Sequence, residues 1–237
     1  MKFENTDVWG FEHALRGMRN PMNSWDKSDS KNMCVCSDDG SLHDEPCGYD
    51  ACCHGCYFEH EFVIGENDMK LAKSLIKAGS EHCKFMRQIF VSVDITAPLY
   101  WWKELDTYKV GTVANSTSTM HKLASTPITK DCFEMDDFEE VDVEEYGDYR
   151  FTDLWDSVIQ LCEVLRKKYN ETKDKRYWKE LIRLLPESWL QKRTVTMSYE
   201  NILKMVRERI NHKLSEWSKS FIDWAKSLPY AKELLFI

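Results

Sequence analysis

The sequence lacks several features that would assign a class of protein directly. No apolar run approaches the roughly 20 residues that a membrane-spanning helix needs. The residues after Met1 mix charges of both signs and have none of the apolar stretch of a signal peptide. There is no Gly-rich phosphate loop, no Gly-x-Ser-x-Gly nucleophile elbow and no His-Glu-x-x-His metal motif. We therefore expect a cytoplasmic protein that belongs to none of these common enzyme classes.

An excess of positive charge is missing as well. The formal net charge of -8 disfavours nonspecific binding to nucleic acid or to an anionic membrane, although a local basic groove could still bind a phosphate. The 237 residues are 43% hydrophobic and 13% aromatic, which is enough to bury a substantial core. In a cytoplasm the nine cysteines should be thiols or metal ligands, because structural disulfides are rare there.

Six of the nine cysteines lie in one segment, residues 28–60, which is poor in aliphatic residues and could not form a core by itself. Four thiolates can hold a tetrahedral Zn2+ and so supply folding energy to such a segment. The spacing favours a structural zinc site made of Cys34, Cys36, Cys53 and Cys56. The alternates are Cys47, Cys52 and His54. The ordinary alternative is a mobile surface insertion with free thiols.

Apolar periodicity predicts the main elements of the remaining chain. A helix should begin at an Asn67 or Asp68 cap and stop at Ala78-Gly79, and a strand over 89–95 should end by Pro98. Further helices are expected over 152–170 and 177–185, the second ended by Pro186. Apolar positions at helical spacing from Ile202 to Trp224 predict one long C-terminal helix.

The C-terminal third carries the most specific pattern of the chain. Leu185-Pro186, Thr194-Val195-Thr196 and a segment with an Arg, His212 and Glu216 follow one another in order. Upstream, Gly79 precedes Glu81, His82 and Phe85. Over residues 66–237 this arrangement resembles the flavin-dependent thymidylate synthases. The resemblance implies an α/β (α+β) fold with a small, mainly antiparallel sheet, a helical C-terminal half and a homotetrameric assembly, to which the Cys-rich insertion is added.

The family's Arg-His-Arg signature is replaced here by Tyr108, Lys109 and Val110, whereas Asn115 and Ser118 remain. A Glu, Glu200, stands where the family has a phosphate-facing Arg. One Lys cannot replace two planar guanidinium groups, each able to bind phosphate with two hydrogen bonds. The resemblance implies that the nucleotide contacts would be Lys109, Asn115, Ser118 and Arg207. It implies that the flavin (FAD) contacts would be His82, His212 and Glu216.

Ordinary structural roles stay open for two of these residues. His82 could be a partly buried polar side chain near a helix start, and Arg207 could belong to the solvated side of its helix. If activity survives, the resemblance implies reductive methylation of dUMP with FAD, a reduced nicotinamide and methylenetetrahydrofolate. The lost arginines argue against that intact reaction and leave nucleotide or flavin binding as the expected function.

The opposing hypothesis is a binding protein that has lost the reaction. Such a protein, of the kind that phages encode as regulators or inhibitors, would use the zinc segment and an acidic strip in the loop 134–148 to bind a protein partner. Composition and motifs together divide the chain into an N-terminal segment (1–27), the Cys-rich segment (28–60) and the synthase-like domain (61–237).

Overall fold

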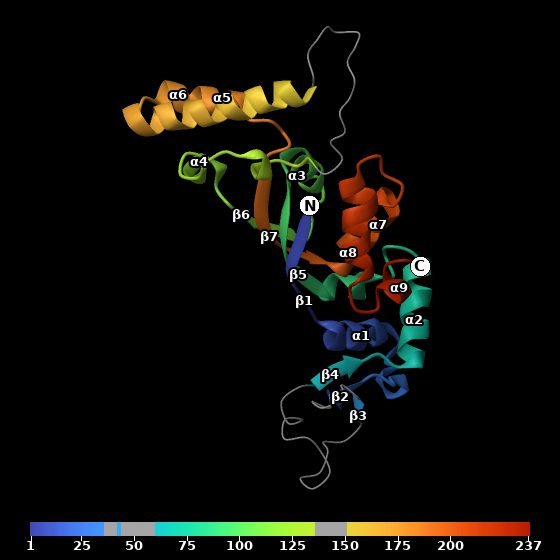
Figure 1. The fold of residues 1–237 in the computed structure, drawn as a ribbon. Coiled ribbons are helices and arrows are strands. Elements are labelled where there is room, and N and C mark those ends of the chain that lie inside the picture. Colours follow the sequence, from blue (N-terminus) through green and yellow to red (C-terminus); the bar gives the residue numbers. More distant parts are fainter. Residues whose placement is uncertain (36–41, 44–59, 136–150) are drawn as a thin grey trace. The chain divides into compact units, whose positions relative to one another are not determined.

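A computed structural model describes four stretches of the chain, residues 1–35, 42–43, 60–135 and 151–237 (Figure 1). A four-stranded sheet has the order β1-β5-β7-β6. Its strands are β1 (Lys2–Trp9), β5 (Phe90–Pro98), β7 (Leu190–Ser198) and β6 (Thr112–Ser116). Alternation along β5 places Val91, Val93 and Ile95 in the core, and the strand reaches Pro98 as expected. The predicted α/β chain with a small antiparallel sheet is confirmed.

The packing of the chain separates two compact units, each made of two stretches. Unit 1 consists of Met1–Thr6 and Ser92–Thr196. Unit 2 consists of Asp7–Val91 and Met197–Ile237. The three ranges expected from composition stay a prediction.

Unit 1 contains two long helices, α5 (Phe151–Thr172) and α6 (Lys175–Leu184), which pack on each other. Both were predicted from apolar spacing, and α6 ends two residues before Pro186. Buried side chains of both helices pack in one apolar cluster with side chains from residues 123–133. The fully buried members are Leu123, Ile128, Phe133, Ile159, Cys162 and Leu181. The shorter helices of the unit are α3 (Leu99–Leu105), α4 (Thr119–Lys122) and the 3-10 helix η4 (Lys130–Cys132).

Unit 2 begins with α1 (Phe11–Arg19), followed by the short 3-10 helices η1 (Asn20–Met22) and η2 (Trp25–Lys27). The residue before α1 is Gly10, whose φ of 96° lies in the left-handed region that L side chains rarely adopt. A Cβ at this position would also collide with the carbonyl oxygen of Gln88. Gly10 therefore allows the close approach of α1 to η3 (Lys84–Gln88).

A three-stranded antiparallel sheet follows in unit 2, with the order β3-β2-β4. Its strands are β2 (Lys31–Val35), β3 (Leu42–His43) and β4 (His60–Val63). The backbone register places Cys34 opposite both His43 and His60. This sheet leads into α2 (Glu66–Lys77).

The start of α2 differs from the sequence prediction. The helix begins at Glu66, so Asn67 and Asp68 lie in its first turn and neither is the cap. The carboxylate of Asp29 instead accepts hydrogen bonds from the backbone N–H groups of Asn67 (2.9 Å) and Asp68 (3.1 Å). The first N–H groups of a helix need acceptors, and here a residue 38 positions away from Asn67 supplies them.

The predicted long C-terminal helix is wrong, because the chain breaks it into pieces. These are α7 (Tyr199–Arg209), the π-helix η6 (Glu216–Phe221), α8 (Ile222–Lys226) and α9 (Ala231–Leu234). In the break, Nδ1 of His212 accepts a hydrogen bond from the backbone N–H of Leu214 at 3.2 Å. Trp217, Phe221 and Trp224 are buried beyond it, so the apolar spacing persists where the helix does not. Among the described residues no helix is long and apolar enough to cross a membrane.

Candidate functional site

Unit 1 holds a cavity of about 900 Å3, within the range of about 300–1,000 Å3 typical of small-molecule sites. Its wall combines hydroxyl groups, lysines and large apolar side chains. The hydroxyl residues are Thr96, Thr117, Ser118, Thr119 and Thr126. The cations are Lys2, Lys122 and Lys130. The apolar wall is formed mainly by Leu123, Phe133, Met135, Trp189 and Leu190.

The hydroxyl-bearing segment Thr117–Thr119 is held against β7. The side-chain amide of Gln191 donates to the carbonyl oxygen of Thr117 (2.9 Å) and to Oγ1 of Thr119 (3.3 Å). The backbone N–H of Thr117 donates to the carbonyl oxygen of Lys192 at 2.9 Å. Ser118 caps α4, since its Oγ accepts from the backbone N–H of His121. Both ends of the segment are therefore fixed before any ligand binds.

Gln191 is itself held in place by Arg193. Nε of Arg193 donates to Oε1 of Gln191 at 3.0 Å, and its Nη1 donates to Asp106 at 2.8 Å. The Arg193 guanidinium also lies over the ring of Trp102, 4.3 Å from the centroid, a cation–π geometry. The Trp102 indole N–H in turn donates to the carbonyl oxygens of Ala97 and Gln191. This network fixes the amide that bonds Thr117 and Thr119, the neighbours of Ser118.

The cavity lining also contains the acids Glu4, which pairs with Lys192 at 3.2 Å, and Asp131, so its basic character comes mainly from Lys122 and Lys2. Lys122, whose ammonium forms no ion pair within the described residues, lies one turn after Ser118, while Lys130 pairs with Asp156 at 2.7 Å. Phe133 and Trp189 stand edge to face with their ring centroids 5.5 Å apart. Lysine and hydroxyl groups can bind a phosphate, and an aromatic wall can contact a base.

The three sequence-predicted nucleotide contacts of unit 1 have different surroundings. Ser118 lines the cavity. Asn115 is exposed on β6, and Lys109 is exposed in the turn before it; neither is among the residues that line this cavity. Tyr108, at the first position of the altered triplet, is 8% exposed and belongs to the core. A core tyrosine cannot take over the role of a solvent-facing arginine.

In unit 2, His82 and Arg207 are exposed. The same unit contains an ion pair of Arg87 and Glu200, whose Nε–Oε2 and Nη2–Oε1 distances are 2.5 and 2.9 Å. The hydrogen bonds and charge of Glu200 raise the pKa of Arg87. Burial, helped by Glu200, raises the pKa of the Cys83 thiol, and Arg207 opposes that shift. Glu200 is thus neutralised by Arg87 within this unit.

The other two predicted flavin contacts belong to the C-terminal segment. The His212 ring packs edge to face with Trp217, 6.4 Å between centroids, and the Arg209 guanidinium lies 5.0 Å from the centroid of the same indole. Glu216 is only 6% exposed. His82 and Arg207 are thus exposed, His212 is half-buried and Glu216 is buried.

The predicted zinc site cannot be placed. Cys36, Cys53 and Cys56 lie outside the described residues, as do the alternates Cys47, Cys52 and His54. Cys34 is buried on β2. Within residues 1–35, 42–43, 60–135 and 151–237, no group of three or more His, Cys, Asp or Glu side chains could hold a metal. The acidic strip also lies largely outside the described stretches.

Two lining residues, Lys122 and Thr119, and Gln191, which holds the lining segment, were missed in the sequence. None of the three belongs to a family motif quoted from the sequence. The one signal for Gln191 is that a long polar side chain follows Leu190 directly, in a strand whose later residues, such as Val195, are buried. Lys122 gives no signal in the sequence, because its place at the cavity depends on how α4 is positioned.

Comparison with solved structures identifies the class of fold. No protein-family model matches the sequence, and no curated protein matches it. Flavin-dependent thymidylate synthase ThyX from Helicobacter pylori, solved with FAD and dUMP, is similar over 100% of this chain and 98% of its own, with a TM-score of 0.64 at 15% identity. A second structure of the same enzyme with FAD and dUMP, at 2.31 Å resolution, gives a TM-score of 0.63 at 15% identity, covering 97% of that chain. The chain therefore has a fold like that of the flavin-dependent thymidylate synthases.

Proposed function

We propose that the protein binds a pyrimidine nucleotide in the cavity of unit 1. The observation that carries this proposal is the placement of Ser118, retained from the family motif, on a braced segment beside Lys122 and an aromatic wall. The likeness to synthase structures that hold dUMP and FAD adds support, since the fold is shared over the whole chain. The ligand's phosphate would contact Lys122 and the hydroxyl groups, and its base would contact Phe133 or Trp189.

The proposal includes FAD as a second ligand and excludes intact dUMP methylation. His82, His212 and Glu216 are the flavin contacts proposed from unit 2. Methylation is lost because Tyr108 is a core residue and Lys109 is a single cation where the family uses two arginines. The flavin, when bound, would carry hydride chemistry. The cytoplasmic location, the homotetramer and the structural zinc remain proposals beside this one.

Two matched lysine substitutions test the nucleotide proposal. We expect Lys122→Gln to weaken dUMP binding, measured by calorimetry, about tenfold or more, because a charge-assisted hydrogen bond contributes about 1.5–3 kcal/mol. Lys109→Gln removes the same charge from a residue outside the cavity lining and should change the affinity less than threefold. Equal losses in both variants, or no dUMP binding by the wild type, would overturn the assignment to this cavity.

Flavin binding is tested separately by the absorbance of the purified protein after incubation with FAD and removal of free cofactor. Retained flavin that His82→Ala releases supports the second ligand, and a colourless protein rejects it. Conversion of dUMP to dTMP with FAD, a reduced nicotinamide and methylenetetrahydrofolate should not occur. Turnover would contradict the loss of methylation without affecting the binding proposal.

The opposing hypothesis, a protein-binding role for the zinc segment and the acidic strip, concerns segments that lie largely outside the described residues. It stays a prediction from the sequence.

A further inference from the structure

Unit 2 contains a second, smaller cavity of about 240 Å3. It lies between the end of α1, the turn containing η2 and the strands β2 and β4. Three cations and one acid are among its lining residues. The lining consists of Glu12, Leu15, Arg16, Arg19, Trp25, Ser28, Ser30, Lys31, Asn32 and Phe62.

Arg19 is the unusual member, because it lines this cavity and is only 5% exposed. Its Nε donates to Oδ1 of Asp68 at 2.5 Å, and its Nη1 donates to the carbonyl oxygen of Ser24 at 3.3 Å. A guanidinium has five N–H donors. Within the described residues these two bonds use Nε and Nη1, so the Nη2 group remains able to donate to a ligand in the cavity.

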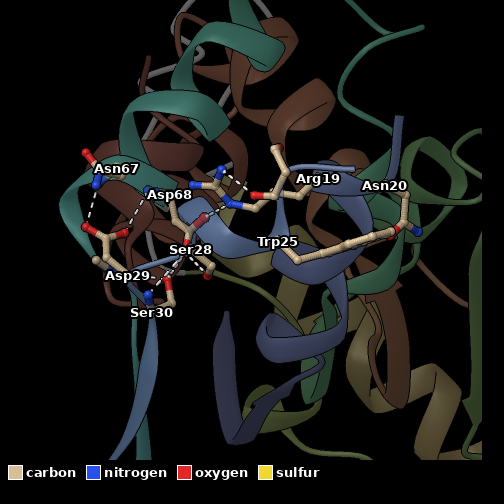
Figure 2. Close-up of polar contacts among 10 residues, drawn as sticks. Arg19, Asn20, Trp25, Ser28, Asp29, Ser30, Asn67 and Asp68 are labelled. Atoms are coloured by element: carbon tan, nitrogen blue, oxygen red, sulfur yellow. Dashed lines mark hydrogen bonds and ion pairs between the residues drawn. The ribbon is translucent and has the colours of Figure 1, made fainter. Parts of the chain in front are cut away.

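The Asp68 carboxylate that accepts from Arg19 is 0% exposed and is itself held by several further hydrogen bonds (Figure 2). The hydroxyl groups of Ser28 and Ser30 both donate to Oδ2 of Asp68 at 2.6 Å, and the backbone N–H of Ser30 donates to it at 3.1 Å. Burial alone would raise the pKa of Asp68, but the bonds from Ser28, Ser30 and Arg19 outweigh it and lower that pKa. The carboxylate is ionised, and it holds the guanidinium in one orientation.

Further donors surround the open side of Arg19. Arg16 lies one turn earlier on the same face of α1, and Lys31 and Asn32 come from the start of β2. Glu12 is the single acidic residue of the lining. The Trp25 indole N–H donates to Oδ1 of Asn20 at 2.9 Å, which fixes a ring that is 47% exposed (Figure 2). The cavity therefore joins oriented cations to an accessible aromatic face.

We propose that this pocket binds a small oxyanion, the phosphate or carboxylate group of a ligand that carries at most one ring. The anion contacts Arg16, Arg19 and Lys31, and a ring attached to it packs against Trp25. The volume lies below the range of about 300–1,000 Å3 for drug-sized ligands, which restricts the occupant to this size. The pocket lies wholly within unit 2 and shares no residue with the unit 1 cavity.

Inorganic phosphate is the first probe, titrated calorimetrically into the full chain against sodium chloride at matched ionic strength. Arg16→Gln should weaken phosphate binding at least fivefold, because Arg16 is exposed enough to be replaced without disturbing the Arg19–Asp68 pair. Lys27→Gln, a loss of the same charge on a neighbouring exposed residue outside the lining, should change it less than twofold. Lys122→Gln, in the other cavity, removes only the phosphate bound in unit 1 and should leave the Arg16-dependent binding unchanged.

Phenyl phosphate tests the aromatic part of the proposal. It should bind more tightly than inorganic phosphate, and Trp25→Leu should remove that gain while preserving the affinity for inorganic phosphate. Absence of phosphate binding, or equal affinities in the wild type and Arg16→Gln, would overturn the pocket. If Lys122→Gln alone abolished binding, the anion would be assigned to unit 1, which supports the proposed nucleotide cavity and rejects this one.

Discussion

Each unit contains an arginine–carboxylate pair removed at least partly from solvent, and the two pairs are built in different ways. In unit 1, Arg166 donates twice to Glu163, at 2.7 and 2.6 Å, three residues away on α5. In unit 2, Arg19 donates to Asp68, 49 residues away, and joins α1 to α2. The Arg166 and Glu163 side chains are 12% and 19% exposed, whereas those of Arg19 and Asp68 are 5% and 0% exposed. The local pair strengthens α5, a helix that the spacing of its apolar residues already predicts. The long-range buried pair decides that α1 and α2 pack together.

The substitution with the largest expected effect on stability is Asp68→Asn. It leaves the buried Arg19 without its counterion, and removing one partner of a buried ion pair costs about 3–5 kcal/mol. We expect a loss of that size in the free energy of unfolding, measured by urea denaturation. Asp26→Asn, at an exposed position of η2, is the matched control and should have little effect. A loss below about 1 kcal/mol for Asp68→Asn would show that the pair does not hold α1 to α2.

Glu163→Gln should have a smaller effect. The pair is partly exposed, so solvent partly screens it, and we expect the free energy of unfolding to fall by about 1–2 kcal/mol. Part of this loss comes from the hydrogen bond that the backbone N–H of Ile128 donates to Glu163 at 2.9 Å, which the substitution weakens. The same urea measurement provides the value. Glu171→Gln on the exposed end of α5 serves as its control, and a cost for Glu163→Gln as large as that of Asp68→Asn would remove the distinction between the two pairs.

Acid should abolish the contribution of Glu163. The hydrogen bonds from Arg166 lower the pKa of Glu163 to about 2, from an ordinary value of 4.5. A carboxyl group whose pKa is lower in the folded state stabilises the fold above its unfolded pKa and loses that contribution as pH falls toward the folded pKa. The difference in unfolding free energy between the wild type and Glu163→Gln should be constant above about pH 5.5 and shrink steadily from pH 4.5 to pH 3. A constant difference over that range would contradict the shift.

The smallest effect is expected at the exposed pair of Arg87 and Glu200. Its side chains are 50% and 22% exposed, so solvent screens the interaction. Arg87→Gln, Glu200→Gln and the double variant should give a weak coupling in a double-mutant cycle, and 0.5 M salt should reduce it further, since surface pairs are screened at high ionic strength. A coupling as strong as that of Arg166 and Glu163 would place Arg87–Glu200 among the structural pairs.

The elements that the sequence predicted well are those whose stability comes from their own apolar faces. The strand ending at Pro98 and the helices α5 and α6 follow period-two and helical spacing closely. The start of α2 and the continuity of the C-terminal helix were wrong. Asp29 supplies the acceptors for α2 from outside the local sequence, and the His212 side chain bonds the backbone inside the break.

Among the candidate-site residues, those in a local motif were predicted and those brought together by tertiary packing were missed. Ser118 was found because it belongs to a spaced motif, and the structure places it on the cavity wall. Lys122 and Gln191 were missed because their relevance depends on how α4 and β7 meet. The Arg19–Asp68 pair and the small cavity beside it were missed for the same reason, since their lining is gathered from several separate elements.

The sequence by itself determined the periodic elements, the acidic surface and a set of motif residues arranged like those of the flavin-dependent thymidylate synthases. These properties depend on side-chain spacing and on charge, which are local or additive along the chain. Only the tertiary structure decided which charges are buried, which hydroxyl and amide groups converge on a cavity and where a helix breaks. Those outcomes depend on residues tens of positions apart, and each is settled by whether a polar group removed from water finds a partner in the fold.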